Sequence, residues 1–181
     1  MRMTTGDREL ALAAAGGDRQ AFASLLSRHY HGLFRLCYRL TGRQAEAEDL
    51  TQDICLALPA KLSRFRGESK FSTWLYRVAV NAAHDKRRRA VTRAKAADGW
   101  GDWEMNRQAA NKETADNVNW LTQAMTSLPQ DLRDTAALTL GEELTHAQAA
   151  DILGVSEGTI SWRLSEIRKR LREMHQKETA S

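Results

Sequence analysis

The stretch LTHAQAADILGVSEGTISWRLSEIRKRL, residues 144–171, has the pattern of two helices joined by a tight turn. Thr145 can cap the first helix and Ser156 the second, while Gly154 suits the left-handed residue of such a turn. The apolar positions expected to face inward on the second helix are Ile160, Leu164 and Ile167. This pattern predicts a helix-turn-helix, whose second helix enters the DNA major groove.

The motif leaves the function open, because repressors, activators and recombinases all use it, and a plain helical hairpin has a similar pattern. The chain has 181 residues, of which 42% are apolar and 28% charged, with two prolines and many good helix formers. These values predict an all-α protein of one or two domains. The net charge is +4, and residues 86–95 hold six basic residues and no acid. That run, and a second one over residues 163–177, favours phosphate binding over a merely solvated face.

Helix signals divide the chain into two helical units. The expected N-terminal helices run from Asp7 to the glycines at 16–17, from Asp18 to about Thr41, from Gln44 to Leu58, and from Ser72 to about Val91. Pro59 is expected to end or kink the third of them, and Pro129 to stand at a first helical position. We therefore expect a four-helix domain over residues 1–91, a flexible linker over 92–115 and a helix-turn-helix domain over 116–181.

The titratable residues show no pattern typical of catalysis or metal binding. Cys37 and Cys55 lie among apolar residues, which predicts buried free thiols, and His29 and His31 are predicted to be surface residues. We expect no enzyme activity, no metal and no cofactor. No segment has the pattern of a signal peptide or a membrane span, so we expect a cytoplasmic protein without membrane insertion.

Three motifs, taken together, resemble the extracytoplasmic-function (ECF) sigma factors of bacterial RNA polymerase. FRGESKFSTWLYRVAVNAAHDKRRR, residues 65–89, resembles the region 2 segment that melts and reads the minus-ten promoter element. AEAEDLTQDICLAL, residues 45–58, is similar to the segment before it, which docks on the β′ clamp of the polymerase. SLPQDLRDTAALTL, residues 127–140, together with residues 144–171 resembles region 4, which reads the minus-thirty-five element.

The resemblance implies three sets of functional residues. The β′ clamp is expected to meet Asp49, Gln52 and Asp53, for which a solvated helix face is the alternative. The minus-ten element is expected to meet Phe65, Arg66, Gly67, Glu68, Ser69, Trp74, Asn81, Lys86, Arg87 and Arg88. In that set, the loop of residues 65–69 and Asn81 hold a flipped base, the cations follow phosphates, and Trp74 is partly a core residue. The minus-thirty-five element is expected to meet Ser156, Thr159, Ser161, Trp162, Arg163, Ser165, Glu166 and Arg170.

The second helix of the motif departs from the family pattern. Ser161, Trp162 and Glu166 stand where the family usually has a basic residue, a serine and an arginine. We therefore expect a minus-thirty-five preference shifted away from guanine, with Arg163 as the main guanine reader and Trp162 able to contact a thymine methyl. The alternative is that Glu166 only pairs with Arg163 or Arg170 and contacts no base.

The resemblance predicts an alternative sigma factor that directs promoter-specific initiation. Its expected partners are core RNA polymerase, through the β′ clamp and the β flap, promoter DNA and an anti-sigma factor. Two other function classes stay open: a stand-alone helix-turn-helix regulator with an N-terminal partner-binding domain, and an adaptor or decoy that binds polymerase without supporting transcription.

Overall fold

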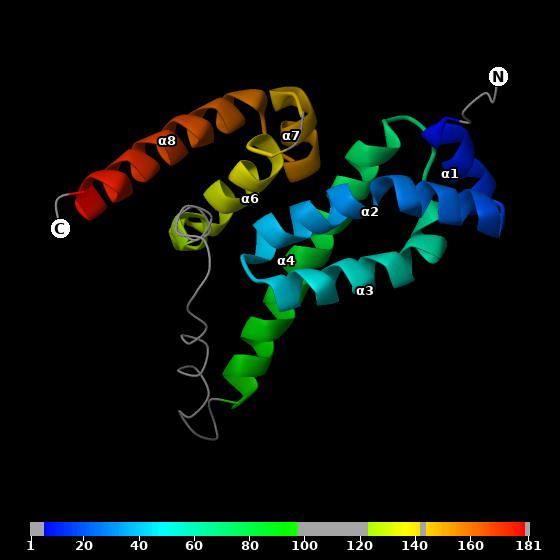
Figure 1. Ribbon diagram of the computed structural model, residues 1–181, viewed down its shortest axis with the longest axis horizontal. Helices are drawn as coiled ribbons and strands as arrows, with labels where there is room; N and C mark the ends of the chain where they lie inside the picture. The colour runs from blue at the N-terminus through cyan, green and yellow to red at the C-terminus, as the bar shows by residue number, and fades with distance from the viewer. Residues whose placement is uncertain (1–5, 98–122, 142–143, 180–181) are drawn as a thin grey trace.

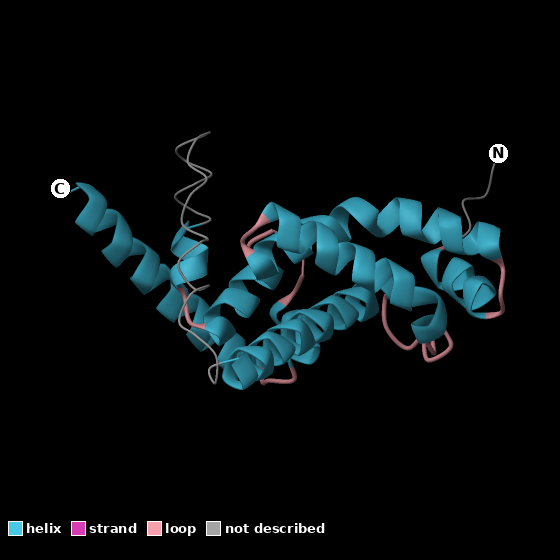
Figure 2. Ribbon diagram, turned by 90° about the horizontal axis from the view of Figure 1, so that it is seen from below, coloured by secondary structure: helices cyan, strands magenta, loops and turns pink. Residues whose placement is uncertain are grey.

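The computed structural model describes residues 6–97, 123–141 and 144–179, and within these ranges it consists of helices and short loops (Figures 1 and 2). The helices are α1 (Asp7–Ala15), α2 (Arg19–Thr41), α3 (Gln44–Leu62), α4 (Phe71–Ala97), α6 (Gln130–Thr139), α7 (His146–Leu153) and α8 (Glu157–Thr179). The all-α prediction is confirmed. Helices α1–α4 form one unit, and α6–α8 form a second unit beside it.

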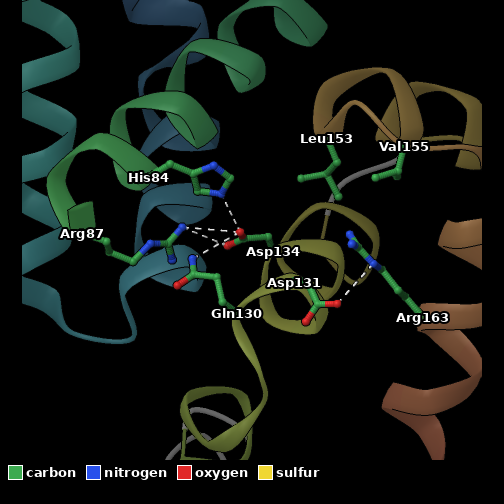
Figure 3. Close-up of a pocket in the computed structure, with 8 residues that line it drawn as sticks. All are labelled: His84, Arg87, Gln130, Asp131, Asp134, Leu153, Val155 and Arg163. Atoms are coloured by element: carbon green, nitrogen blue, oxygen red, sulfur yellow. Dashed lines mark hydrogen bonds and ion pairs between the residues drawn. The ribbon is translucent and has the colours of Figure 1, made fainter. Parts of the chain in front are cut away.

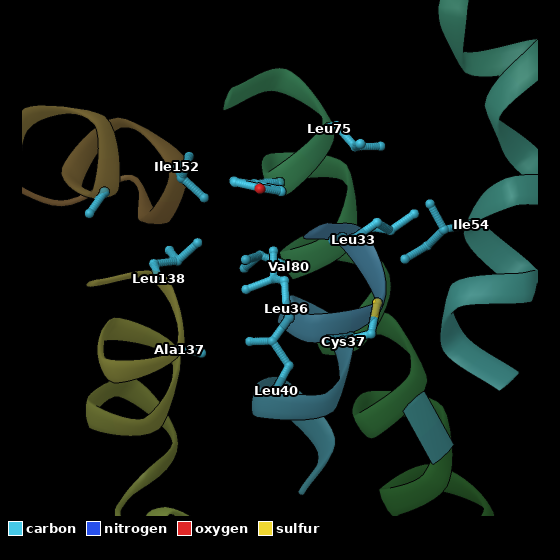
Figure 4. Close-up of a cluster of buried hydrophobic side chains, with 14 of the residues drawn as sticks. Leu33, Leu36, Cys37, Leu40, Ile54, Leu75, Val80, Ala137, Leu138 and Ile152 are labelled. Carbon is cyan, nitrogen blue, oxygen red and sulfur yellow. The ribbon is translucent and has the colours of Figure 1, made fainter. Parts of the chain in front are cut away.

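The N-terminal unit is organised around α2. The Asp18 side chain caps this helix by accepting from the Gln20 and Ala21 amides at 2.9 and 3.0 Å, and Gly42 ends it with a φ of 74°. The fully buried leucines and isoleucine of α2 and α3 are Leu25, Leu33, Leu36, Leu40, Leu50, Ile54 and Leu62. Each such side chain contributes about 1.5–3 kcal/mol on burial, so this cluster stabilises the packing of α2 on α3; Figure 4 shows Leu33, Leu36, Leu40 and Ile54 of it.

Two predicted helix ends are wrong. Pro59 does not end α3. The helix continues for three residues beyond it, to Leu62. Leu58 and Leu62 are both buried, so packing on either side of the proline holds the last turn in helical form. Helix α4 continues to Ala97, six residues past the predicted end and into the predicted linker. The rest of that linker, residues 98–115, lies outside the described residues.

The helix-turn-helix prediction is confirmed in detail. Thr145 Oγ1 accepts from the Gln148 amide at 3.2 Å, while Gln148 Oε1 accepts from the Thr145 amide at 2.9 Å. Gly154 ends α7 with a φ of 66°. Ser156 Oγ then caps α8 by accepting from the Thr159 amide at 3.1 Å. The predicted buried stripe of α8, Ile160, Leu164 and Ile167, lies in the core. Pro129 stands one residue earlier than predicted, at the N-cap of α6.

The two units pack on each other, with α6 against α2 and α7 against α4. Figure 4 shows Ala137, Leu138 and Ile152 of the second unit facing the α2 and α4 side chains of the first, and these residues belong to one continuous apolar cluster. Helical periodicity does not predict this contact, because the α2 and α6 residues that meet are about a hundred positions apart in the chain.

Cys37 and Cys55 are both free thiols, and they differ in burial. Cys37 is fully buried, and burial raises the pKa of its thiol to about 11, so the thiol stays protonated. Cys55 is only half-buried, although it was predicted to be buried.

The prediction that His29 is a surface residue is wrong. Its Nε2 lies 2.7 Å from Asp7 Oδ2, and its ring packs edge-on against Phe71 at 5.0 Å. His31 is exposed, as predicted.

Candidate DNA and polymerase interfaces

The outer face of α3 presents the residues predicted to bind polymerase. Asp49, Gln52 and Asp53 are all exposed, and their spacing of three and four places them on one face. Leu56 continues this face and is 76% exposed, although sequence reasoning did not select it. The sequence pattern could have identified Leu56, because it is an apolar residue three positions after Asp53 and lies off the buried stripe of α3. The face therefore combines carboxylates with an exposed apolar side chain, as protein-binding surfaces do.

The loop before α4 is held in place by aromatic packing. Phe65 is buried, with ring centroids 5.8 Å from Phe71 and 5.4 Å from Trp74. It anchors the loop and does not offer its face to a base, and the half-buried Trp74 belongs to the same cluster. Of the other predicted loop residues, Arg66, Glu68 and Ser69 are exposed, and Gly67 has a φ of 70°. Three polar side chains of the loop are thus open to a ligand.

Asn81 of α4 lies on a face of this helix that the second unit approaches. Asn81 is exposed. Arg77, one turn before it on the same face, pairs with Asp151 of α7, and His84, one turn after it, pairs with Asp134 of α6. Asn81 therefore lies between two contacts that join the units. The loop of residues 65–69 precedes α4, so Asn81 stands ten residues, about 15 Å, along the helix from Phe71.

The predicted phosphate-binding cations of α4 lie in different environments. Arg88 is exposed and pairs with Asp85 at 2.8 Å, and Lys86 is half-buried. Arg87 points instead toward the second unit, where its Nη2 lies 3.2 Å from Asp134 Oδ1. In the described arrangement Arg87 is therefore bound to a carboxylate in place of a phosphate.

Asp134 is the centre of a polar cluster between the units (Figure 3). Its side chain is only 3% exposed. It accepts from Arg87 and lies 2.7 Å from His84 Nε2, both on α4, and Gln130 Nε2 lies 3.3 Å from it within α6. A buried carboxylate needs such partners, because an unpaired one is strongly disfavoured. Sequence reasoning missed this cluster, since its partners lie about 50 positions apart.

Only some of the residues of α8 that were predicted to bind the minus-thirty-five element are exposed. Ser161, Trp162 and Ser165 are exposed, and Trp162 is 61% exposed. Ser156 and Thr159 are engaged in capping, with 2.9 Å between their hydroxyls. Glu166 Oε1 accepts from Arg170 Nε at 2.9 Å, the pairing stated above as the alternative to base contact.

Arg163 lies on a different side of α8. Its side chain is 15% exposed and extends toward α6, with Nε 3.6 Å from Asp131 Oδ2 and Nη1 3.4 Å from Thr135 Oγ1 (Figure 3). In this arrangement it does not reach a base edge, so its role as guanine reader stays a prediction that requires the side chain to leave α6.

The described part of the chain contains no group of three or more His, Cys, Asp or Glu side chains placed to hold a metal ion. In the same part of the chain, no helix is long and apolar enough to cross a bilayer.

Two family models match the two units. The model of sigma-70 region 2 matches residues 25–93, and that of sigma-70, region 4, matches residues 124–173. These limits enclose α3 and most of α2 and α4 in the first case, and α6, α7 and most of α8 in the second.

Relatives with similar sequences cover nearly the whole chain. The ECF RNA polymerase sigma factor SigM of Mycobacterium tuberculosis is 36% identical, covering 94% of this chain and 85% of the relative. The ECF RNA polymerase sigma factor SigW of Bacillus subtilis is 28% identical, covering 87% and 90%. Among solved structures, the sigma factor RpoE of Bartonella quintana, in complex with the anti-sigma factor NepR, is 26% identical with a TM-score of 0.71, covering 86% and 96%. On the joint evidence of helix-turn-helix, region matches and near-complete coverage, the chain belongs to the ECF sigma factors of RNA polymerase.

Proposed function

We propose that this sigma factor binds core RNA polymerase through the outer face of α3 and directs initiation by reading two promoter elements with its two units. The observation that carries the proposal is the exposed face of Asp49, Gln52, Asp53 and Leu56 in a chain that also has a helix-turn-helix. The sigma-70 region 2 match over residues 25–93 includes this face and favours polymerase as its partner over the partner of a stand-alone regulator. The acids suit the arginine-rich clamp of β′ that the family resemblance implies, and Leu56 adds an apolar contact.

The minus-ten element is assigned to the loop before α4 and to α4 itself. Arg66, Glu68 and Ser69 supply exposed polar groups to a flipped base, and Asn81 lines the same path along α4. Phe65 and Trp74 support the loop from inside. Lys86, Arg87 and Arg88 bind backbone phosphates, Arg87 after it has left Asp134.

The minus-thirty-five element is assigned to α8, which enters the major groove as the second helix of the motif. The division into domains over residues 1–91 and 116–181 is part of this proposal, with residues 92–115 joining them. A second contact, between the C-terminal domain and the β flap, is also part of it. The polymerase carries out the chemistry, so the chain itself needs no catalytic group, metal or cofactor.

An anti-sigma factor is the proposed regulatory partner, because the similar RpoE was solved as such a complex. The proposed location is the cytoplasm, where the polymerase acts.

The test is transcription in vitro with purified core polymerase on a library of promoter fragments. The chain should direct specific initiation that core polymerase alone does not give. Sequence-specific binding to duplex DNA without polymerase and without any transcription would favour the stand-alone regulator. Polymerase binding with no transcript from any fragment would favour the adaptor.

Asn81→Ala should reduce open-complex formation by roughly tenfold while core-polymerase affinity stays unchanged. Asn81 is exposed, so its replacement removes contacts to DNA and no packing. The measurement is the rate of open-complex formation on duplex and on pre-melted promoters. Since base flipping is disfavoured by a few kcal/mol in duplex DNA and by less in single strands, the pre-melted promoter should restore part of the rate. A defect of the same size on both templates would remove Asn81 from the melting step. Gln20→Ala, which removes another exposed side-chain amide, on α2, is the matched control.

A further inference from the structure

The first two turns of α8 lack the usual guanine-reading group on their outer face. Between Glu157 and Ser165, a segment that the structure describes completely, Arg163 is the only lysine or arginine. Its guanidinium lies against Asp131 and Thr135 of α6, away from the outer face. Because bidentate hydrogen bonds from arginine or lysine are the commonest specific contact with guanine, this face is poorly suited to a guanine-rich element.

The same face presents one large side chain. Trp162 is 61% exposed, and the residues beside it on the outer side, Ser161 and Ser165, are small and exposed. One turn further on, the Glu166 carboxylate is held by Arg170 at 2.9 Å. Trp162 lies in the half of the helix that meets base edges in a helix-turn-helix, so its indole is the large group placed there to contact a base.

The chemistry of indole selects among the four bases. Its ring offers apolar surface, and its only polar group is the Nε1–H donor. In the major groove, thymine alone presents a methyl group, beside the O4 acceptor. Guanine presents two acceptors and no apolar group there. A single indole can therefore cover the methyl of thymine and donate to its neighbouring oxygen.

We infer that Trp162 is the principal base-reading residue of α8, and that it reads the 5-methyl group of thymine in the minus-thirty-five element. This replaces the expectation that Arg163 is the main reader. The inference rests on the proposed function, in which α8 lies in the groove of that element. Lys169 and Arg172, further along the exposed side of the helix, serve the phosphates of the same site.

The experiment uses holoenzyme reconstituted from core polymerase and the full chain. Selection from a library randomised over the minus-thirty-five element first gives the preferred sequence, which should contain thymine at the position that Trp162 reaches. Each thymine is then replaced by deoxyuridine, which removes only the methyl group. At the position read by Trp162, wild-type holoenzyme should lose affinity roughly fourfold, the value of one buried methyl-sized group.

Trp162→Ala should bind the thymine promoter on the order of tenfold more weakly and should no longer distinguish thymine from deoxyuridine. Leu12→Ala, which removes another exposed apolar side chain far from α8 in sequence, should keep the wild-type discrimination. Because Trp162 is largely exposed, circular dichroism of the variant should match the wild type.

The outcomes separate this inference from the proposed function. If wild-type holoenzyme initiates specifically, yet deoxyuridine has no effect at any position, the inference is overturned and the function stands. A Trp162→Ala variant that loses affinity but keeps the wild-type response to deoxyuridine also overturns it, since the indole then contacts something other than the methyl. Absence of specific initiation by the wild type overturns the proposed function itself.

Discussion

Asp49→Arg combined with Asp53→Arg should lower the affinity for core polymerase at least a hundredfold while leaving the helical fold intact. Both carboxylates are exposed one turn apart on α3, so neither replacement disturbs the core formed by the opposite face. The family resemblance implies a basic clamp as the partner, and like charges brought together at an interface cost several kcal/mol. The measurement is binding to core polymerase without DNA, by fluorescence or pull-down.

A control reverses one charge, as each of the two α3 replacements does, at another exposed acid. Glu68→Arg lies in the loop assigned to the minus-ten base, so it should bind core polymerase normally. Leu56→Ala should weaken binding by an intermediate amount, because it removes an apolar contact and adds no repulsion. If the double variant binds as tightly as the wild type, α3 does not form the polymerase interface.

Asp134→Lys should separate the two helical units in the free protein. Its carboxylate is almost completely buried and faces Arg87 and His84 of α4, so a lysine there meets the Arg87 cation and loses the contacts with both residues. The radius of gyration from small-angle X-ray scattering should increase. Asp131→Lys is the control, because Asp131 is half exposed and pairs with Arg163 inside the second unit.

Variants of Arg87, the α4 partner of Asp134, distinguish separation of the units from a folding defect in α6. Arg87→Glu should also open the protein, and Arg87→Asp combined with Asp134→Arg should restore compactness. An unchanged radius of gyration in both single variants would show that the apolar contact of Ala137, Leu138 and Ile152 holds the units together alone.

Separation of the two units is relevant to promoter binding because the two promoter elements are far apart on the DNA. Elements centred at minus ten and minus thirty-five are roughly 25 base pairs apart, which corresponds to about 85 Å of B-DNA at 3.4 Å per base pair. Helices α4 and α7 are in contact in the described arrangement, and Asn81 lies between two of the joining polar contacts, Arg77–Asp151 and His84–Asp134. Asp134→Lys should therefore bind single-stranded minus-ten DNA more tightly than the wild type, because Arg87 and the face of Asn81 become available.

Sequence determined the features that depend on neighbouring residues. The caps at Thr145 and Ser156 were predicted from residue type, because a cap needs only a short side chain and an amide two or three residues away. The buried stripe of α8 followed from its period. The Glu166–Arg170 pair was foreseen as an alternative, since residues four apart on a helix are always neighbours.

Tertiary structure alone decided where the long polar side chains point. Arg163 turns to Asp131 and Thr135, and Arg87 turns to Asp134, about 30 and 50 positions away. Helical period gives the direction in which such a residue leaves its own helix, but the partner depends on which other helix packs there. The last turn of α3 beyond Pro59 has the same origin, because the burial of Leu62 in the core outweighs the local preference of proline.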